Sequence, residues 1–391
     1  MNTQMLALLL ATVALAPSLS VSGHTLHWTG SSTASYKVNA KASDGTAANT
    51  PVEGTSYAPP AQPGLTVSYR VKVRGEKVWS NTVTIAWPTE EKTQPPGTLK
   101  GINAGTETLD LTGADTLRAK VVRIHFSASE PGVSWLPEWN QRYAEHGVKL
   151  QPVVTFDGHM LSAQEAKGLV SLDRLPGLED VELGNETSYG YQYGDGYTAA
   201  SYKERARVYA VRVREAAEVL NPHGIGVLAQ AEDGGSGSNT WVKEMFASVP
   251  NLSRYVAAWV IHPYTNQRTA AQSDTQGVPK MERMVAQLAE VGDTTTPIAI
   301  TEWGVSSDEG RTLDNGASLT SSEAAKIAET TVPRLLAATG RHPVQSFLLY
   351  QVRDQAPHGE STSREMYFGA LTRSDGSKGP FTTAIQKLLA G

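Results

Sequence analysis

From residue 99 onward, the sequence alternates between short apolar runs and longer amphipathic segments. This alternation constrains the fold more than any other feature, because eight of the apolar runs have the length of buried strands. They lie at residues 99–104, 120–126, 149–156, 180–184, 226–231, 256–261, 297–301 and 345–350. The clearest amphipathic helices between them are expected at 135–146, 199–220, 280–291 and 321–338. This number and order of elements predicts a (β/α)8 TIM barrel over residues 98–391.

A doubly wound open sheet also alternates strands with helices, so it is the main alternative fold. Such a sheet usually carries a glycine-rich phosphate loop after its first strand. Here the first strand passes into Gly101-Ile102-Asn103-Ala104-Gly105, which lacks the spacing of a dinucleotide-binding fingerprint. The barrel is therefore the prediction, and no cofactor is implied.

Residues 17–88 have a different pattern, in which short alternating strands are separated by turns rich in Gly, Pro and Asp. This pattern predicts a small all-β sandwich. The spacing of Trp28, Tyr36 and segment 65–69, with Tyr69 as a tyrosine corner, resembles a fibronectin type III module. Any other small sandwich fits the pattern too.

Two further segments complete the expected organisation. Residues 89–97 are polar and proline-rich, which is typical of a semi-rigid linker. Residues 5–16 form an apolar stretch of signal-peptide length, too short to span a bilayer, so residues 1–16 are predicted to direct secretion. The first four residues lack Lys and Arg, and Pro17 follows the best cleavage site, so a misassigned start or an N-terminal strand is the alternative.

Composition excludes several classes of function. The net charge is −5 and no basic block interrupts the sequence, which argues against a nucleic-acid partner. The absence of cysteine excludes disulfides, thiol nucleophiles and thiolate metal sites. The histidines lack the i, i+4 spacing of metal ligands, so no metal site is predicted. We expect a monomer without a membrane span.

Two glutamates occupy matching positions in the barrel pattern. Glu186 follows the apolar run at 180–184, and Glu302 follows the run at 297–301. A carboxylate at the end of a buried strand is costly unless partners or function compensate for its desolvation. Two such carboxylates on different strand ends are what a sugar-cleaving site with paired carboxylates requires.

Further polar and aromatic residues gather at the predicted C-terminal strand ends, where the active site of a TIM barrel lies. These residues are Arg123, His125, Asp157, His159, Asn185, His262, Tyr264, Trp303, Tyr350 and Gln351. Strand-end polarity without function would be scattered over both rims, whereas these residues favour one.

Five of these features, in this strand order, resemble clan A of the glycoside hydrolases, the retaining barrel enzymes of the family 5 and family 39 type. The resemblance covers residues 99–391 and implies that Glu186, in Asn185-Glu186, is the acid/base and Glu302 the nucleophile. It also implies that Arg123 contacts the nucleophile and that Asn185 holds the sugar 2-hydroxyl. The strand-six residues His262 and Tyr264 match the remaining positions. Thr187 replaces the proline common in family 5, and Tyr350 stands where tryptophan is common, which leaves family and substrate open.

Several of these residues have a structural alternative. Arg123 could form only an ion pair with Glu182 inside the barrel, and His125 could be a core histidine rather than a sugar ligand. Asp157 and His159 could simply cap the loop after the third strand.

Aromatic side chains determine what a sugar site can hold, because pyranose faces stack on rings. The loop 188–197 is rich in Tyr and Gly and is predicted to form a wall of the cleft, with Tyr189, Tyr191 and Tyr193 as candidate platforms. A loop packed over the next helix is the alternative.

Together these features predict a secreted, two-domain, retaining glycosidase that cleaves β-glycosidic bonds in a poly- or oligosaccharide. A non-catalytic carbohydrate-binding barrel is the alternative, and the two carboxylates count against it. A third possibility is an adhesion or scaffold protein whose functional part is the sandwich, but this would leave the barrel unexplained.

Overall fold

The computed structural model describes residues 16–22, 25–43, 45–59, 65–86, 98–104, 109–129, 135–156, 159–189, 201–231, 240–264, 270–314, 316–374 and 376–390. The chain divides into two compact units, Met1–Gln94 and Pro95–Gly391. Most of the predicted signal segment and the whole predicted linker lie outside the described residues. Among the described helices, none is both long and apolar enough to cross a membrane.

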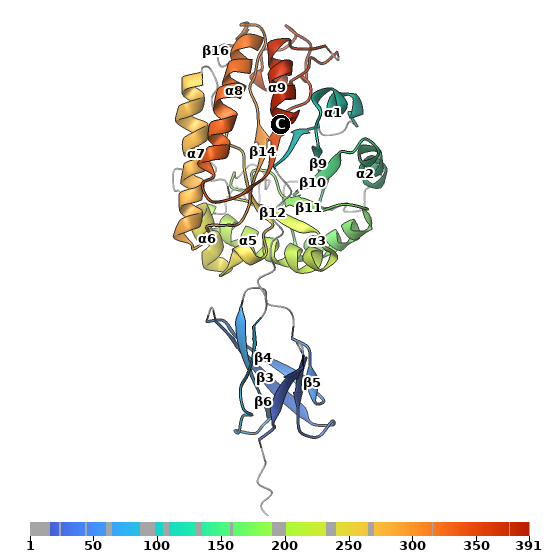
Figure 1. The fold of residues 1–391 in the computed structure, drawn as a ribbon, viewed down its shortest axis with the longest axis vertical. Coiled ribbons are helices and arrows are strands. Elements are labelled where there is room, and N and C mark those ends of the chain that lie inside the picture. The colour runs from blue at the N-terminus through green and yellow to red at the C-terminus, as the bar shows by residue number, and fades with distance from the viewer. Residues whose placement is uncertain are drawn as a thin grey trace, which may run out of the picture. The chain divides into compact units, whose positions relative to one another are not determined.

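The N-terminal unit consists of two antiparallel sheets (Figure 1). One has the order β1-β2-β5 and the other the order β4-β3-β6-β7. The strands are β1 (Leu19–Ser22), β2 (Thr25–Trp28), β3 (Ser35–Ala42), β4 (Ala47–Glu53), β5 (Ser56–Tyr57), β6 (Thr66–Val73) and β7 (Val83–Ala86). Side chains from both sheets form one core that includes Trp28, Tyr36 and Tyr69. Strand β7 begins at Val83, and the preceding Val78 is exposed and lies outside the strands.

The C-terminal unit is a closed barrel of parallel strands in the order β8-β9-β10-β11-β12-β13-β14-β17 (Figure 1). The strands are β8 (Leu99–Asn103), β9 (Val121–Ser127), β10 (Lys149–Thr155), β11 (Asp180–Leu183), β12 (Gly226–Gln230), β13 (Ala258–Ile261), β14 (Ile298–Trp303) and β17 (Val344–Leu349). A short antiparallel pair, β15 (Thr312–Leu313) and β16 (Gly316–Ala317), follows β14. The barrel and its eight strands confirm the sequence prediction.

Helices alternate with the strands along the barrel unit (Figure 1). They are α1 (Leu111–Leu117), α2 (Trp135–Glu145), α3 (Ala163–Gly168), α5 (Tyr202–Leu220), α6 (Trp241–Ser248), α7 (Ala270–Glu290), α8 (Ser321–Ala338) and α9 (Pro380–Ala390), with shorter turns η1 (Leu169–Arg174), η3 (Asn221–His223), η4 (Leu252–Arg254) and η5 (Arg364–Tyr367). Helix α7 starts earlier than the predicted residue 280, since residues 270–277 contain no large apolar side chain to reveal a helical period.

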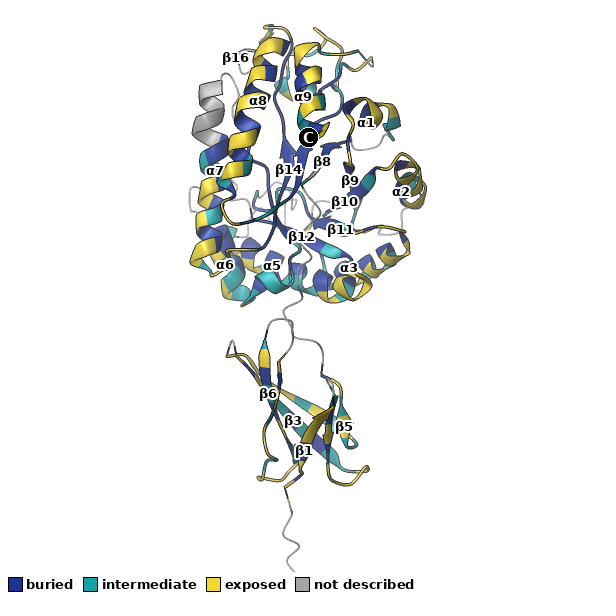
Figure 2. Cartoon of the chain, in the orientation of Figure 1, coloured by how far each residue is buried: buried dark blue, intermediate teal, exposed yellow. Residues whose placement is uncertain are grey.

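The barrel interior has an apolar part and a polar part. Leu228, Ala258, Val260 and Ala299 form a small cluster of their own, separate from the large core that includes the helices. Figure 2 shows that the barrel strands are buried while the helices expose one face. Polar side chains fill the rest of the interior, and they form the candidate site.

Candidate active site

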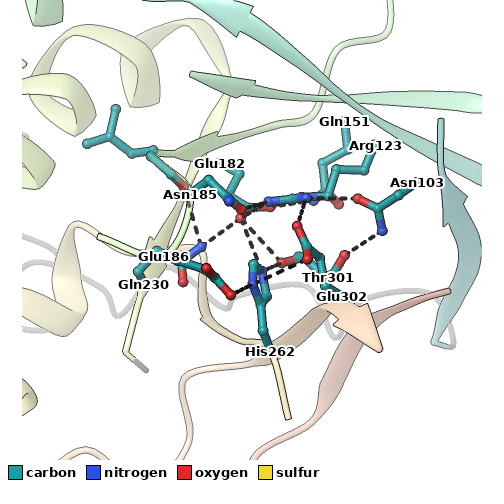
Figure 3. Close-up of polar contacts among 12 residues, drawn as sticks. Asn103, Arg123, Gln151, Glu182, Asn185, Glu186, Gln230, His262, Thr301 and Glu302 are labelled. Atoms are coloured by element: carbon teal, nitrogen blue, oxygen red, sulfur yellow. Dashed lines mark hydrogen bonds and ion pairs between the residues drawn. The ribbon is translucent and has the colours of Figure 1, made fainter. Parts of the chain in front are cut away.

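Arg123, on β9, is the centre of the polar layer and is fully buried. Its Nε and Nη2 atoms donate to the two carboxylate oxygens of Glu182, on β11, each at 2.7 Å. This two-point pairing fixes the guanidinium plane. The remaining donors reach Asn103 Oδ1 at 2.8 Å and Asn185 Oδ1 at 2.7 Å, so Arg123 is more than the ion pair that was its alternative (Figure 3).

Glu182 receives further donors besides Arg123. The amide nitrogens of Gln151 and Gln230 lie 3.2 Å and 2.7 Å from its oxygens, and the Thr301 hydroxyl lies at 3.3 Å. Burial alone would raise the pKa of Glu182, but Arg123 and the nearby His262 lower it to about 2. An ionised carboxylate whose oxygens are occupied by donors has a structural role, because it holds Arg123 in place.

Glu302 lies near the end of β14 and keeps its carboxylate at the mouth of the barrel. Its Oε1 accepts a hydrogen bond from Arg123 Nη1 at 2.5 Å, and its Oε2 accepts one from the Tyr264 hydroxyl at 2.9 Å. Burial and the charge of Glu302 raise the pKa of Tyr264 well above its usual range, so the phenol stays protonated and donates. The side chain of Glu302 is 9% exposed, enough for a small reacting group to reach it.

The pairing of β14 with β17 shifts register between Ile300 and Trp303. A strict strand would point Thr301 and Glu302 to opposite sides. Here Thr301 donates to Glu182 inside the barrel, and Glu302 bonds Arg123 there as well. Such irregularities re-aim side chains next to active sites.

Glu186 follows β11, and its carboxylate approaches that of Glu302 on β14, three strands further round the barrel. Its backbone φ is +47°, a left-handed conformation that residues other than glycine rarely adopt and that is often found at functional sites. His262 Nδ1 lies 3.4 Å from Glu186 Oε1 and 3.7 Å from Glu302 Oε2. One ligand atom from each of these three residues lies within 4.8 Å of the other two, so the two carboxylates face each other across a short gap (Figure 3).

Gly184 makes the turn into Glu186 possible. Its φ is +77°, and a Cβ atom there would lie 2.3 Å from Thr187 Cγ2 and 2.7 Å from the Phe156 ring. Only glycine fits both the backbone angle and the space. The chain can therefore leave β11 sharply and present Glu186 at the rim.

His262 supplies positive charge beside both carboxylates. Burial alone would lower its pKa, but the charge of Glu302 and hydrogen bonds with Glu182 and Glu186 raise the pKa to about 10. Its Nε2 lies 2.9 Å from the Thr301 hydroxyl. Glu186, His262 and Glu302 have the donor types of a metal site. When its imidazole is protonated, His262 can donate from Nδ1 toward both carboxylates.

The other predicted ligands differ in their placement. Burial and the charge of Arg123 lower the pKa of His125 to about 4, so this half-buried histidine is neutral and 3.3 Å from Arg123 Nη1. Tyr350 is half-buried beside Tyr264, and its hydroxyl donates to Glu365 at 2.8 Å. The Tyr189 backbone nitrogen donates to the Glu186 carbonyl, which places Tyr189 next to the acid/base candidate.

Trp303 and His159 are placed differently from these residues. Trp303 has no exposed surface and packs against Phe347, so its ring offers no exposed face to a sugar in this structure. His159 is exposed and contacts Glu165 of α3 at 2.8 Å, as its capping alternative requires. Asp157, Tyr191 and Tyr193 lie outside the described residues.

Sequence reasoning missed several polar residues of the layer. Asn103, Gln151, Gln230 and Thr301 all hydrogen-bond within it, and Glu365 joins it through Tyr350. The available signal was an uncharged polar residue inside an otherwise apolar strand run. In a barrel, such residues point either inward or toward the helices, and the sequence does not distinguish the two.

A scan against models of known protein families finds no match to this sequence, and a search of curated proteins finds none either. Solved structures do resemble it. A calcium-binding mutant of β-glucuronidase 2 from Bacteroides uniformis has a TM-score of 0.51 at 12% identity, over 95% of this chain and 49% of that one. A family 39 glycoside hydrolase from Bacteroides cellulosilyticus WH2 has a TM-score of 0.51 at 12% identity, over 94% and 81%. A β-glucuronidase from Ruminococcus gnavus has a TM-score of 0.50 at 13% identity, over 95% and 66%.

At such identities the likeness shows a common fold. The chain spans about half of the Bacteroides uniformis enzyme and about two thirds of the Ruminococcus gnavus enzyme.

Proposed function

We propose that this protein is a retaining glycoside hydrolase of the clan A type, which cleaves β-glycosidic bonds in a poly- or oligosaccharide. The observation that carries the proposal is the approach of Glu186 and Glu302, whose nearest carboxylate oxygens lie within 4.8 Å. Retaining enzymes hold their two carboxyl groups about 5–5.5 Å apart, whereas inverting enzymes leave about 6.5–9.5 Å for a water.

The roles follow from the partners of each carboxylate. A carboxylate oxygen of Glu302 attacks the anomeric carbon while the bond to the leaving oxygen breaks, and Glu186 donates its proton to that oxygen. In the second step, Glu186 takes a proton from water, which attacks the anomeric carbon and releases Glu302. The sum is hydrolysis with retained configuration.

Arg123 and Tyr264 support this assignment of the nucleophile. They donate to different oxygens of Glu302, which fixes the carboxylate plane while leaving room for attack. Glu186 is the more exposed of the two at 20%, as suits a group that exchanges protons with the leaving group and with water. Asn185 beside Arg123 is the proposed ligand of the sugar 2-hydroxyl.

Three finer proposals accompany the activity. The apolar segment at residues 5–16 supports secretion by a signal peptide. The two-sheet core with Trp28, Tyr36 and Tyr69 supports a fibronectin type III-like sandwich. We also propose that the protein acts on carbohydrate as a monomer, because the residues of the site described here all come from one chain.

The test compares Glu186→Ala and Glu302→Ala with the unaltered enzyme. A product-release screen over glucans, mannans, xylans, galactans and bacterial exopolysaccharides first identifies a substrate. Glu302→Ala should lose all turnover, and azide could restore it only by direct attack with inversion. Glu186→Ala should still glycosylate rapidly with a good leaving group, and azide should rescue the second step with retained configuration.

Anomer analysis of the azide products by NMR decides between the roles. An inverted product from Glu186→Ala and a retained product from Glu302→Ala would reverse the two assignments. A barrel that binds sugar without catalysis is the second possibility raised by the sequence. Sugar binding with no hydrolysis of any substrate, equally in the unaltered chain and in Glu302→Gln, would establish it.

A further inference from the structure

The outer face of the sheet β4-β3-β6-β7 gathers positive charge. Strands β3 and β6 pair so that Lys37 lies opposite Lys72 and Lys41 lies opposite Ser68. The alternate residues of both strands are buried in the sandwich core, so these side chains point outward. Arg70 and Lys72 share that face on β6. We call Lys37, Lys41, Arg70 and Lys72, with the neighbouring Trp79, the basic face.

This arrangement is unfavourable for the sheet alone. Like charges directly opposite each other on paired strands are destabilising, and Lys37 and Lys72 are such a pair. Among the described residues, none of the four cations forms an ion pair. Arg70 Nε donates to Asn39 Oδ1 at 3.0 Å, and Lys72 Nζ donates to the Glu76 carbonyl at 2.7 Å.

The positive charge of the basic face differs in sign from that of the whole chain. The chain as a whole carries a net charge of −5, so the basic face is a local feature. Glu53, opposite Ser35 at the start of β3, is a carboxylate on the same side of the sheet. It lies at the margin and contacts none of the four cations.

Trp79 adds an aromatic surface to the basic face. Arg70 lies 4.6 Å and Lys72 lies 4.9 Å from the centroid of its ring, so the indole orders both cations by cation–π contact. The indole is half-buried. Cations held beside a partly exposed ring suit a ligand that is anionic and also carries flat apolar faces.

We propose that the basic face binds an anionic polysaccharide, a polymer with carboxylate or sulfate groups on its sugar rings. Lys37 and Lys41 are four residues apart on β3, about 13 Å along the strand. The cations are therefore spread along an extended path, which matches charges that repeat along a polymer. The choice of a polysaccharide over other polyanions rests on the proposed glycosidase activity of the same chain.

The test uses the full chain in a Glu302→Ala background, so that the polymer is not consumed. Affinity electrophoresis in gels containing polygalacturonate or neutral dextran measures retention. The triple variant Lys37→Gln, Arg70→Gln and Lys72→Gln should bind polygalacturonate about a hundredfold more weakly, since each cation at an anionic surface contributes about a fivefold factor. Dextran should retain neither chain.

A control triple, Lys120→Gln, Lys167→Gln and Lys326→Gln, removes as many positive charges from exposed positions of the barrel unit. It should keep full binding, and an equal loss in both triples overturns the proposal. Trp79→Ala should weaken binding to polygalacturonate but not to polyphosphate. Tighter binding to duplex DNA or to phosphatidylglycerol vesicles than to polygalacturonate also overturns it.

Unchanged thermal transitions establish that the variants are folded. Hydrolysis of a short soluble substrate by the basic-face triple with Glu302 intact should be unaffected. If no substrate is hydrolysed while polygalacturonate retention still depends on the basic face, the glycosidase proposal fails and binding stands. If a substrate is hydrolysed but retention by polygalacturonate does not depend on the basic face, the binding proposal fails and the glycosidase proposal stands.

Discussion

The barrel mouth and the basic face of the sandwich differ in how far their charged side chains are buried and paired. In the barrel mouth, Arg123 and Glu182 are fully buried and their charged atoms have hydrogen-bond partners. On the sandwich, the half-buried Lys37 and Lys72 face each other, and neither has a carboxylate partner among the described residues.

The difference follows from the cost of removing an ion from water. A buried ion that lacks partners is strongly destabilising, so the barrel must surround each charge with donors or acceptors. Those partners also fix the position of the site, since Arg123 joins Glu182, Asn185 and Glu302. A cation that keeps contact with solvent needs no carboxylate partner, and its charge stays available for a ligand. Buried charge therefore positions groups, whereas exposed charge can bind them.

The largest expected effect comes from Glu182→Ala. Removing this carboxylate leaves Arg123 buried with only part of its compensation, which should lower the free energy of unfolding of the barrel by about 3–5 kcal/mol. Denaturant unfolding followed by tryptophan fluorescence measures the loss. Glu182→Gln keeps hydrogen-bonding atoms in place and is the matched control, expected to lose less. A loss below about 1 kcal/mol in Glu182→Ala would show that the buried layer tolerates an unpaired charge.

Arg123→Lys tests whether the buried charge positions the nucleophile. Lysine keeps the charge but lacks the planar fork that contacts Glu182, Asn185 and Glu302 together. We expect kcat to fall about a hundredfold with a smaller change in KM, because a misplaced nucleophile affects the chemical step. Arg142→Lys is the control, since Arg142 is exposed and lies 3.7 Å from Glu138 on the same helix. A normal kcat in Arg123→Lys would contradict a positioning role.

The sequence predicted the parts of this site that follow the simplest periodicities. Strand runs followed by helices identify the barrel, and Glu186 and Glu302 stand out because each lies within two residues of the end of an apolar run. The burial of Trp303 and the register shift in β14 were not foreseen, because the shift is a property of the pairing with β17, which no local pattern reveals. Gln151 and Gln230 were missed because their role is to donate hydrogen bonds to Glu182. That residue lies on another strand, so a local pattern does not reveal the contact.

The N-terminal end of β11 offers a smaller, pH-dependent effect within the barrel. Burial and the neighbouring charge of Glu179 raise the pKa of Asp180 to about 7, from an ordinary value near 3.8. The folded state therefore holds a proton that the unfolded state releases between these values, so stability falls as pH rises through that window. Asp180→Asn should match the unaltered chain near pH 4 and exceed its stability above pH 7.

Denaturant unfolding across this pH range measures the difference. Asparagine can still accept the hydrogen bond that Gln345 donates to Asp180. Glu329→Gln, at an exposed position of α8, is the control and should show no growing difference with pH. A gap that is constant with pH would mean that Asp180 titrates normally.

The smallest effect belongs to the sandwich, and it has the opposite sign from the effect at Glu182. Lys37→Gln removes one of two like charges that face each other, so it should raise the free energy of unfolding of the sandwich by a few tenths of a kcal/mol. The gain should shrink at about 1 M salt, where the screening length is about 3 Å. Lys41→Gln is the matched control, because Lys41 lies opposite the neutral Ser68. A double-mutant cycle with Lys72→Gln isolates the pair. If Lys37→Gln instead destabilises the sandwich, the cations of the basic face support the sheet, and the contrast with the buried layer disappears.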